Sequence, residues 1–149
     1  MIRPALSVAA AIAAPVAAAG PLSITSQMLK EQRTAAADGT TRVQLVPIGR
    51  AVPGDRLTVV VAYRNAGGVP IASLTLVNPV PTGVAYRGAA PGSPTPDLSV
   101  DGVRFGPLAA LSVAGRPAGL ADVTHVRWRI AKPVAAGGGG QFAFLAVLK

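Results

Sequence analysis

Apolar and polar residues alternate with a period of two along much of this 149-residue chain, which is the pattern of half-buried β-strands. The alternation is clear in residues 41–46, 57–65, 73–78 and 125–130. Residues 142–148 are instead apolar on both faces, as in a central strand or a strand that pairs with a second molecule. Within 125–130 the residues Val126, Trp128 and Ile130 share one face, so we expect Trp128 in the core.

Glycine and proline separate these segments. Val52-Pro53-Gly54-Asp55 is a turn sequence, and Asp38-Gly39 and Asp101-Gly102 each predict a hairpin. Residues 22–24 suit a strand while 27–33 would also suit a helical turn, and the Asp38-Gly39 pair that follows favours a strand. Residues 137–140, all glycine, predict a flexible turn. Short strands at this spacing predict one all-β domain, an antiparallel two-sheet sandwich of seven or eight strands.

Residues 1–19 have the three parts of a secretory signal peptide, namely basic Arg3, an apolar run over residues 5–14 and small residues before the cleavage site. Because Ala17 and Ala19 fill the small positions, we place the cleavage after Ala19. The protein is then exported to the periplasm, the cell surface or the medium. The apolar run is shorter than the roughly 20 residues that span a bilayer, so we expect no transmembrane segment in the mature chain.

Three motifs follow one another in the second part of the chain. Val52-Pro53-Gly54-Asp55 enters a strand, Tyr63-Arg64-Asn65-Ala66-Gly67 ends it, and the strand over 74–78 closes with Pro79-Val80-Pro81-Thr82-Gly83-Val84 before Tyr86. In this order they resemble the conserved-repeat domain of bacterial surface proteins known as domain of unknown function eleven. The resemblance implies an immunoglobulin-like sandwich over residues 50–149, with a cell-surface, adhesive or structural role and no catalytic residues. Asn78 stands where that family usually has Asp, so we predict no metal site. Residues 20–49 lie before this domain as an N-terminal strand extension.

The chain is basic, with 14 Lys and Arg against 6 Asp and Glu and a net charge of +8. The arginines are scattered rather than clustered, and stacking aromatics are few, which argues against nucleic-acid binding. Arg127 and Arg129 share one strand face and, with Arg64 on a neighbouring strand, would form a basic stripe for an acidic glycan or lipopolysaccharide. A solvated sheet face explains the same pattern without a ligand.

Catalytic chemistry has little support in the sequence. The chain has one histidine, His125, and no cysteine, so a zinc site would need carboxylates that this acid-poor chain barely supplies. No serine lies in a G-x-S-x-G motif, and Asp38, Asp55 and Asp101 already have turn roles. We therefore expect neither an enzyme nor a bound cofactor.

These observations predict an exported structural or interaction module with a protein partner or a second copy of itself as its ligand. In its sharper form, residues 21–36 are a detachable strand that completes the sheet of the next subunit in a filament. The apolar residues of this assembly strand are Leu22, Ile24, Met28 and Leu29. The alternative is a binding protein for acidic glycan or lipopolysaccharide.

Overall fold

A computed structural model describes residues 21–149 of the chain, and the predicted signal peptide at 1–19 lies outside these described residues. Ten strands and two short 3-10 helices, η1 and η2, make up the regular structure. The strands are β1 (Leu22–Ala35), β2 (Thr41–Pro47), β3 (Arg56–Asn65), β4 (Leu74–Pro79), β5 (Val84–Ala89), β6 (Asp97–Ser99), β7 (Ser112–Val113), β8 (Arg116–Pro117), β9 (His125–Ile130) and β10 (Gly139–Leu148), and the helices are η1 (Leu108–Ala110) and η2 (Leu120–Asp122).

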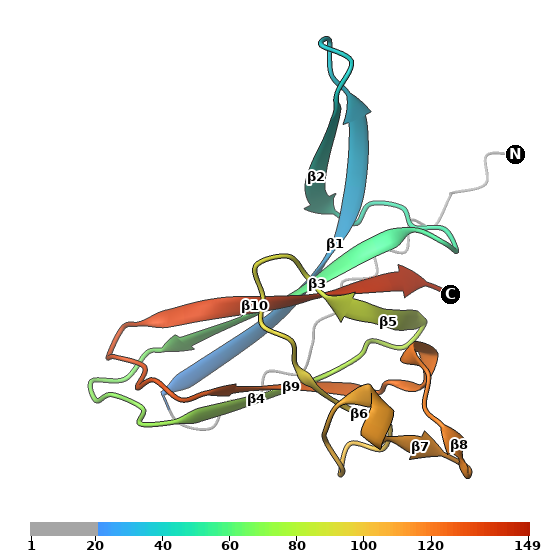
Figure 1. The fold of residues 1–149 in the computed structure, drawn as a ribbon. Coiled ribbons are helices and arrows are strands. Elements are labelled where there is room, and N and C mark those ends of the chain that lie inside the picture. Colours follow the sequence, from blue (N-terminus) through green and yellow to red (C-terminus); the bar gives the residue numbers. More distant parts are fainter. Residues whose placement is uncertain (1–20) are drawn as a thin grey trace, which may run out of the picture.

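Two antiparallel sheets face each other in the sandwich that the alternating pattern predicts (Figure 1). One sheet has the strand order β2-β1-β3-β10-β5, and the other has the order β4-β9-β6. The eight strands of these two sheets confirm the predicted seven or eight. The small β7–β8 pair lies in the connection between β6 and β9.

The core lies between the sheets and is built from alternate positions of their strands. β3 supplies Leu57, Val59 and Val61, each no more than 2 % exposed. Trp128 of β9 is 3 % exposed and stacks on Phe142 of β10 at 5.2 Å between ring centroids, which confirms its predicted place in the core. Residues 144–148 of β10 lie between β3 and β5, so this half is a central strand, as its apolar faces predict.

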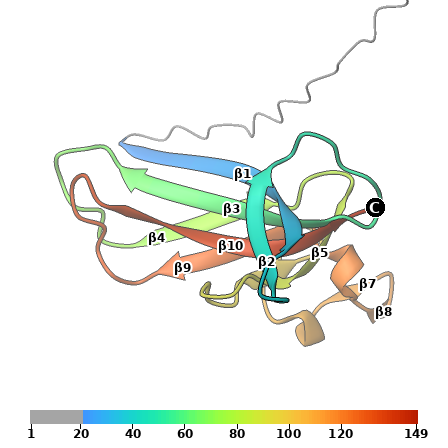
Figure 2. The same cartoon turned by 90° about the horizontal axis from the view of Figure 1, so that it is seen from above.

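The N-terminal extension is a strand, as the Asp38-Gly39 pair indicates, and it has two partners in succession. Residues Leu22 to Lys30 of β1 pair with β3, whereas Leu29 to Ala35 pair with β2. Gly39 has φ of 82°, a left-handed value that suits the turn between β1 and β2. The far half of this hairpin has no other sheet neighbour, and it projects from the sandwich as an arm (Figures 1 and 2). We call β2 and the second half of β1 the arm.

The prediction of a hairpin at Asp101-Gly102 is wrong. β6 ends at Ser99, and beyond the turn only an isolated bridge between Leu98 and Gly106 forms. The reason lies in the side chain of Asp101, whose Oδ1 accepts bonds from the backbone N–H groups of Val103 and Arg104 at 2.8 and 2.9 Å. These groups are then directed inward around the turn rather than sideways into a ladder.

The four consecutive glycines do not form one flexible turn, because two of them lie in a strand. Gly139 and Gly140 belong to β10 and pair with Arg64 and Tyr63 of β3. A Cβ on Gly139 would lie 2.2 Å from the backbone oxygen of Tyr63, and one on Gly140 would lie 2.6 Å from the Tyr63 hydroxyl. Glycine is therefore required at 139 by the close approach of the β3 backbone, whereas at 140 a larger residue would have to displace the Tyr63 ring.

Candidate interaction surface

Arg127 is the most constrained of the candidate anion-binding residues. Its guanidinium donates to Asp97 at 2.9 Å and lies 4.5 Å from the ring centre of Phe105, a cation–π contact. The side chain is 19 % exposed, and its Nε is buried without a hydrogen-bond partner. The charge of Arg127 is thus largely used within the subunit, by β6 and the loop that follows it.

The predicted arginine stripe does not form as one surface. Arg127 and Arg129 lie on the outer face of the β4-β9-β6 sheet, because Val126 and Trp128 occupy the inner face of β9. Arg64 lies on β3 in the other sheet, where Val61 and Tyr63 set the inner face, so it faces outward on the opposite side of the sandwich. The sequence pattern correctly predicts which side chains of β3 and β9 point outward, but these two strands belong to different sheets.

All six carboxylates of the chain are held by neighbouring groups. Glu31, Asp55, Asp97 and Asp122 form ion pairs with Arg33, Lys30, Arg127 and Arg116 respectively. Asp38 accepts bonds from Thr40, and Asp101 accepts the turn bonds described above. Within residues 21–149, no three His, Cys, Asp or Glu side chains come together in a way that could hold a metal ion. His125 is half-buried, with its Nδ1 at 2.9 Å from the Thr124 hydroxyl.

Four of these carboxyl groups have lowered pKa values with local causes. The Thr40 hydroxyl lowers the pKa of Asp38, Lys30 lowers that of Asp55, the backbone N–H of Arg104 lowers that of Asp101, and Arg116 lowers that of Asp122. A lowered folded-state pKa stabilises the fold above the unfolded pKa, about 3.9, and this contribution is lost as the pH falls further. We expect the urea midpoint to fall between pH 4 and pH 2, and to fall less in Asp101→Asn. A midpoint independent of pH over this range would contradict the assignment.

The first half of the predicted assembly strand lies at an edge of the five-stranded sheet, because β2 pairs only with Leu29 to Ala35. Leu22, Ile24 and Met28 point inward and pack against the core cluster, yet they remain only half-buried. The five-stranded sheet faces a sheet of only three strands, so the inner face of β1 is covered less than that of the strands at the centre of its sheet. Leu29 has the opposite parity and pairs with Thr58 on the outer face, so it does not join the other three.

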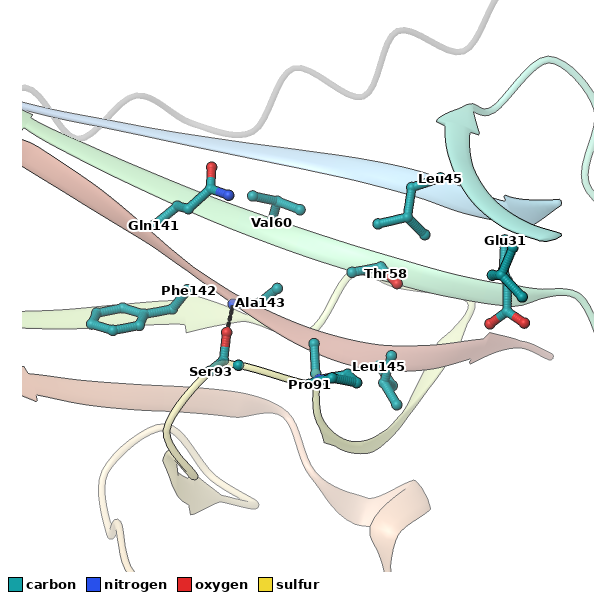
Figure 3. A pocket seen from close by; sticks show the side chains of 13 residues that line it. Glu31, Leu45, Thr58, Val60, Pro91, Ser93, Gln141, Phe142, Ala143 and Leu145 are labelled. Carbon is teal, nitrogen blue, oxygen red and sulfur yellow. Dashed lines mark hydrogen bonds between the residues drawn. The ribbon is translucent and has the colours of Figure 1, made fainter.

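A groove of about 540 Å³ lies between the arm and the outer face of the five-stranded sheet. β2 leans over this face (Figure 2). Val43 and Leu45 of β2 line the groove and are 52 % and 48 % exposed. The floor includes Val60 and Leu145, and the loop with Pro91 and Ser93 forms the other side (Figure 3). Glu31 is the one titratable residue in its lining, so the groove is an apolar contact surface rather than a site for acid–base chemistry.

The groove and the free edge of β1 are two features that the sequence reasoning missed. The exposed Val43 and Leu45 alternate like core residues, and their pattern alone places them in a sandwich interior. The edge of β1 does have a signal in the sequence, since residues 21–29 contain no charged side chain, which is unusual for an edge strand.

The fold and these surfaces define the protein as an all-β, antiparallel two-sheet sandwich with an N-terminal arm. Comparisons with protein-family models, with curated proteins and with solved structures give no match to the chain. The resemblance to the surface-protein repeat domain therefore stays a prediction. Within the described part of the chain, no helix has the length and apolar character needed to cross a bilayer.

Proposed function

We propose that this protein is a non-enzymatic, exported module of the cell envelope or surface that assembles with further copies of itself by exchanging β1. The observation that carries the proposal is the place of β1. It is the first described strand, no described strand covers its first half on the side away from β3, and it supplies Leu22, Ile24 and Met28 to the core over a nine-residue register. The same strand from another copy would satisfy the same backbone and side-chain contacts.

The engagement of all six carboxylates supports a structural rather than a catalytic role. Each one accepts a bond from a turn or an arginine or lysine side chain, so none is positioned to act as a free general base. The apolar groove beside the arm also supports a role in contacts, because exposed apolar patches commonly mark interaction sites or ligand-binding grooves.

Disulfide trapping tests the exchange, because the chain has no cysteine of its own. Gln27 and Val60 are register partners on the outer faces of β1 and β3. Antiparallel partners lie within the Cα separation that a disulfide spans. In the purified mature protein, we expect Gln27→Cys/Val60→Cys to give a reducible ladder of multimers on oxidation.

A matched pair on β3 and β10 provides the control. Ala62→Cys/Gln141→Cys also joins register partners, but both strands stay in one subunit during the exchange. This pair should link only within the chain. If the Gln27/Val60 pair also closed only within the chain, at every protein concentration, the exchange would be excluded.

A further inference from the structure

The free edge of β1 is open over a defined set of backbone groups. The N–H of Ala66 donates to the carbonyl of Pro21 at 2.7 Å, and this bond extends the β1–β3 register by one residue. Because the backbone groups of successive residues in an antiparallel strand point to opposite sides, those of Ser23, Thr25 and Gln27 face β3. Those of Leu22, Ile24 and Ser26 face away from it.

No described strand covers that side of β1 before Leu29, where the pairing with β2 begins. The bond from the Ala36 N–H to the Thr40 carbonyl at 2.7 Å agrees with this assignment, since it places the groups of even-numbered residues on the β2 side. The open edge is therefore a five-residue segment, 22–26, with three donors and three acceptors. That length is typical of a whole strand in a sheet.

The edges formed by β5, β4 and β6 are protected in ways that this one is not. β5 carries exposed Arg87, and its register with β10 shifts beside Gly88, where φ is 133°. β4 ends at Pro79, which has no N–H, and β6 has only three residues. Charges, prolines and irregular registers are the devices by which edge strands avoid pairing with other chains.

The outer edge of the arm is also protected, because β2 carries Arg42 and ends at Pro47. Residues 22–26 contain neither a charge nor a proline. Their inward side chains Leu22 and Ile24 are still half-buried and would be covered further by a strand laid alongside. At this edge, therefore, the backbone groups have no partner strand among the described residues, and the apolar side chains beside them are only half-covered.

We infer that the open edge of β1 pairs antiparallel with the same edge of a second copy, about a two-fold axis, and so joins two five-stranded sheets into one. The occupant is a second copy because an uncharged antiparallel edge is complementary to itself and meets no like charge there. This inference rests on the proposed role in assembly but does not need the strand to be exchanged.

The geometry also specifies the register. Leu22, Ile24 and Ser26 have the open backbone groups in each copy. All of these groups form intermolecular hydrogen bonds only if Ile24 pairs with Ile24 of the second copy and Leu22 pairs with its Ser26. Ser23 of one copy then lies directly opposite Thr25 of the other, with both side chains on the outer face. Two copies of Thr25, or two of Ser23, would be diagonal neighbours about 7–8 Å apart, beyond easy disulfide reach.

Cysteine mixing tests this register in the full mature chain. Ser23→Cys and Thr25→Cys are oxidised separately and as an equimolar mixture, and dimers are measured on non-reducing gels. We expect the mixture to give at least about fivefold more dimer than either variant alone, since only the mixed pair has the required separation. Equal yields in all three samples, or no dimer in any, would overturn the inference.

A proline substitution tests the edge without cysteines. Ser26→Pro removes an N–H that faces the open side, so the β1–β3 ladder keeps all its bonds. We expect the dimer to dissociate at least about tenfold more readily in sedimentation analysis, because two intermolecular bonds are lost across the two-fold axis. Ser26→Ala should associate like the natural protein. Unchanged association of a folded Ser26→Pro would overturn the inference.

Thr25→Lys covers the case in which the proline variant fails to fold. The substitution places two lysines close to the two-fold axis on the exposed face, so association should weaken and then recover as salt is added. Weakening that salt does not reverse would count against the inference. A dimer from the cysteine mixture without a Gln27/Val60 ladder would support edge pairing and exclude strand exchange. A multimer ladder from Gln27→Cys/Val60→Cys without a dimer from the cysteine mixture would support strand exchange and exclude edge pairing.

Discussion

Phe144→Ala is expected to lower the free energy of unfolding by about 3–5 kcal/mol, the cost usual for removing a large buried ring. Phe144 is 0 % exposed, and it lies on an interior strand of the five-stranded sheet, on the face that meets the other sheet. Its ring centre is 5.7 Å from that of Tyr86 and 6.3 Å from that of Trp128. No neighbouring strand can close the resulting cavity, because β3 and β5 hold β10 on both sides.

Urea unfolding followed by Trp128 fluorescence would measure this loss. Leu145→Ala provides the control, because Leu145 is the next residue of the same strand and faces outward into the groove. We expect that variant to lose at most about 1.5 kcal/mol, since its side chain is already partly in water. Equal losses at the two positions would mean that the sandwich interior is not where the fold derives its stability.

Asn65→Leu is expected to cost about 3 kcal/mol or more, although the side chain is similar in size and more apolar. Asn65 is 0 % exposed at the end of β3. Its Nδ2 donates to the carbonyls of Val69 and Val134 at 2.8 and 3.1 Å, and its Oδ1 accepts from the N–H of Gly67 at 3.0 Å. Leucine would leave the Val69 carbonyl and the Gly67 N–H without this partner in a place that water reaches poorly, and the Val134 carbonyl would keep only its bond from the Ile71 N–H.

The effect of Asn65→Leu should extend to the start of β1. The loop after Asn65 holds that end of the strand, because Ala66 donates to Pro21 and a Cβ on Gly67 would lie 2.5 Å from the Pro21 side chain. Amide hydrogen exchange should therefore rise in the first residues of β1 as well as in the loop. The free energy of unfolding itself would come from urea titration.

Asn78→Leu is the matched control, since Asn78 is also buried but makes a single side-chain bond, to the carbonyl of Pro79 at 2.9 Å. We expect it to cost about 1 kcal/mol. A loss at Asn78 as large as that at Asn65 would show that burial of the amide, and not its three bonds, sets the cost.

Several elements could be predicted from the chain because their causes are local. The period-two pattern places Val126 and Trp128 on the buried face of β9, and the Asp38-Gly39 pair predicts the turn between β1 and β2. Asp101-Gly102 has the same two residues but no hairpin, because Ser99 and Asp101 hold the turn through side-chain bonds. A dipeptide can identify a turn, but whether strands continue from it depends on which backbone groups remain free.

The candidate surface was less predictable, for a related reason. Alternation shows that Arg64 and Arg127 point away from the core, but it does not show that their strands lie in different sheets. Likewise, the apolar Leu22 and Ile24 predict a strand with a buried face, whereas the order β2-β1-β3 decides that part of this strand remains an edge. Pairing between distant strands depends on contacts that no local pattern contains.

The sequence by itself determined an all-β sandwich, the parity of its main strands and the strand nature of the N-terminal extension, since these follow from side-chain periodicity and turn chemistry. Only the tertiary structure decided that residues 144–148 of β10 are enclosed between two strands, that the arginines are divided between two faces and that residues 22–26 have an open edge. The physical reason is that a strand's hydrogen bonds lie in the plane of the sheet, at right angles to the side chains whose pattern the sequence displays.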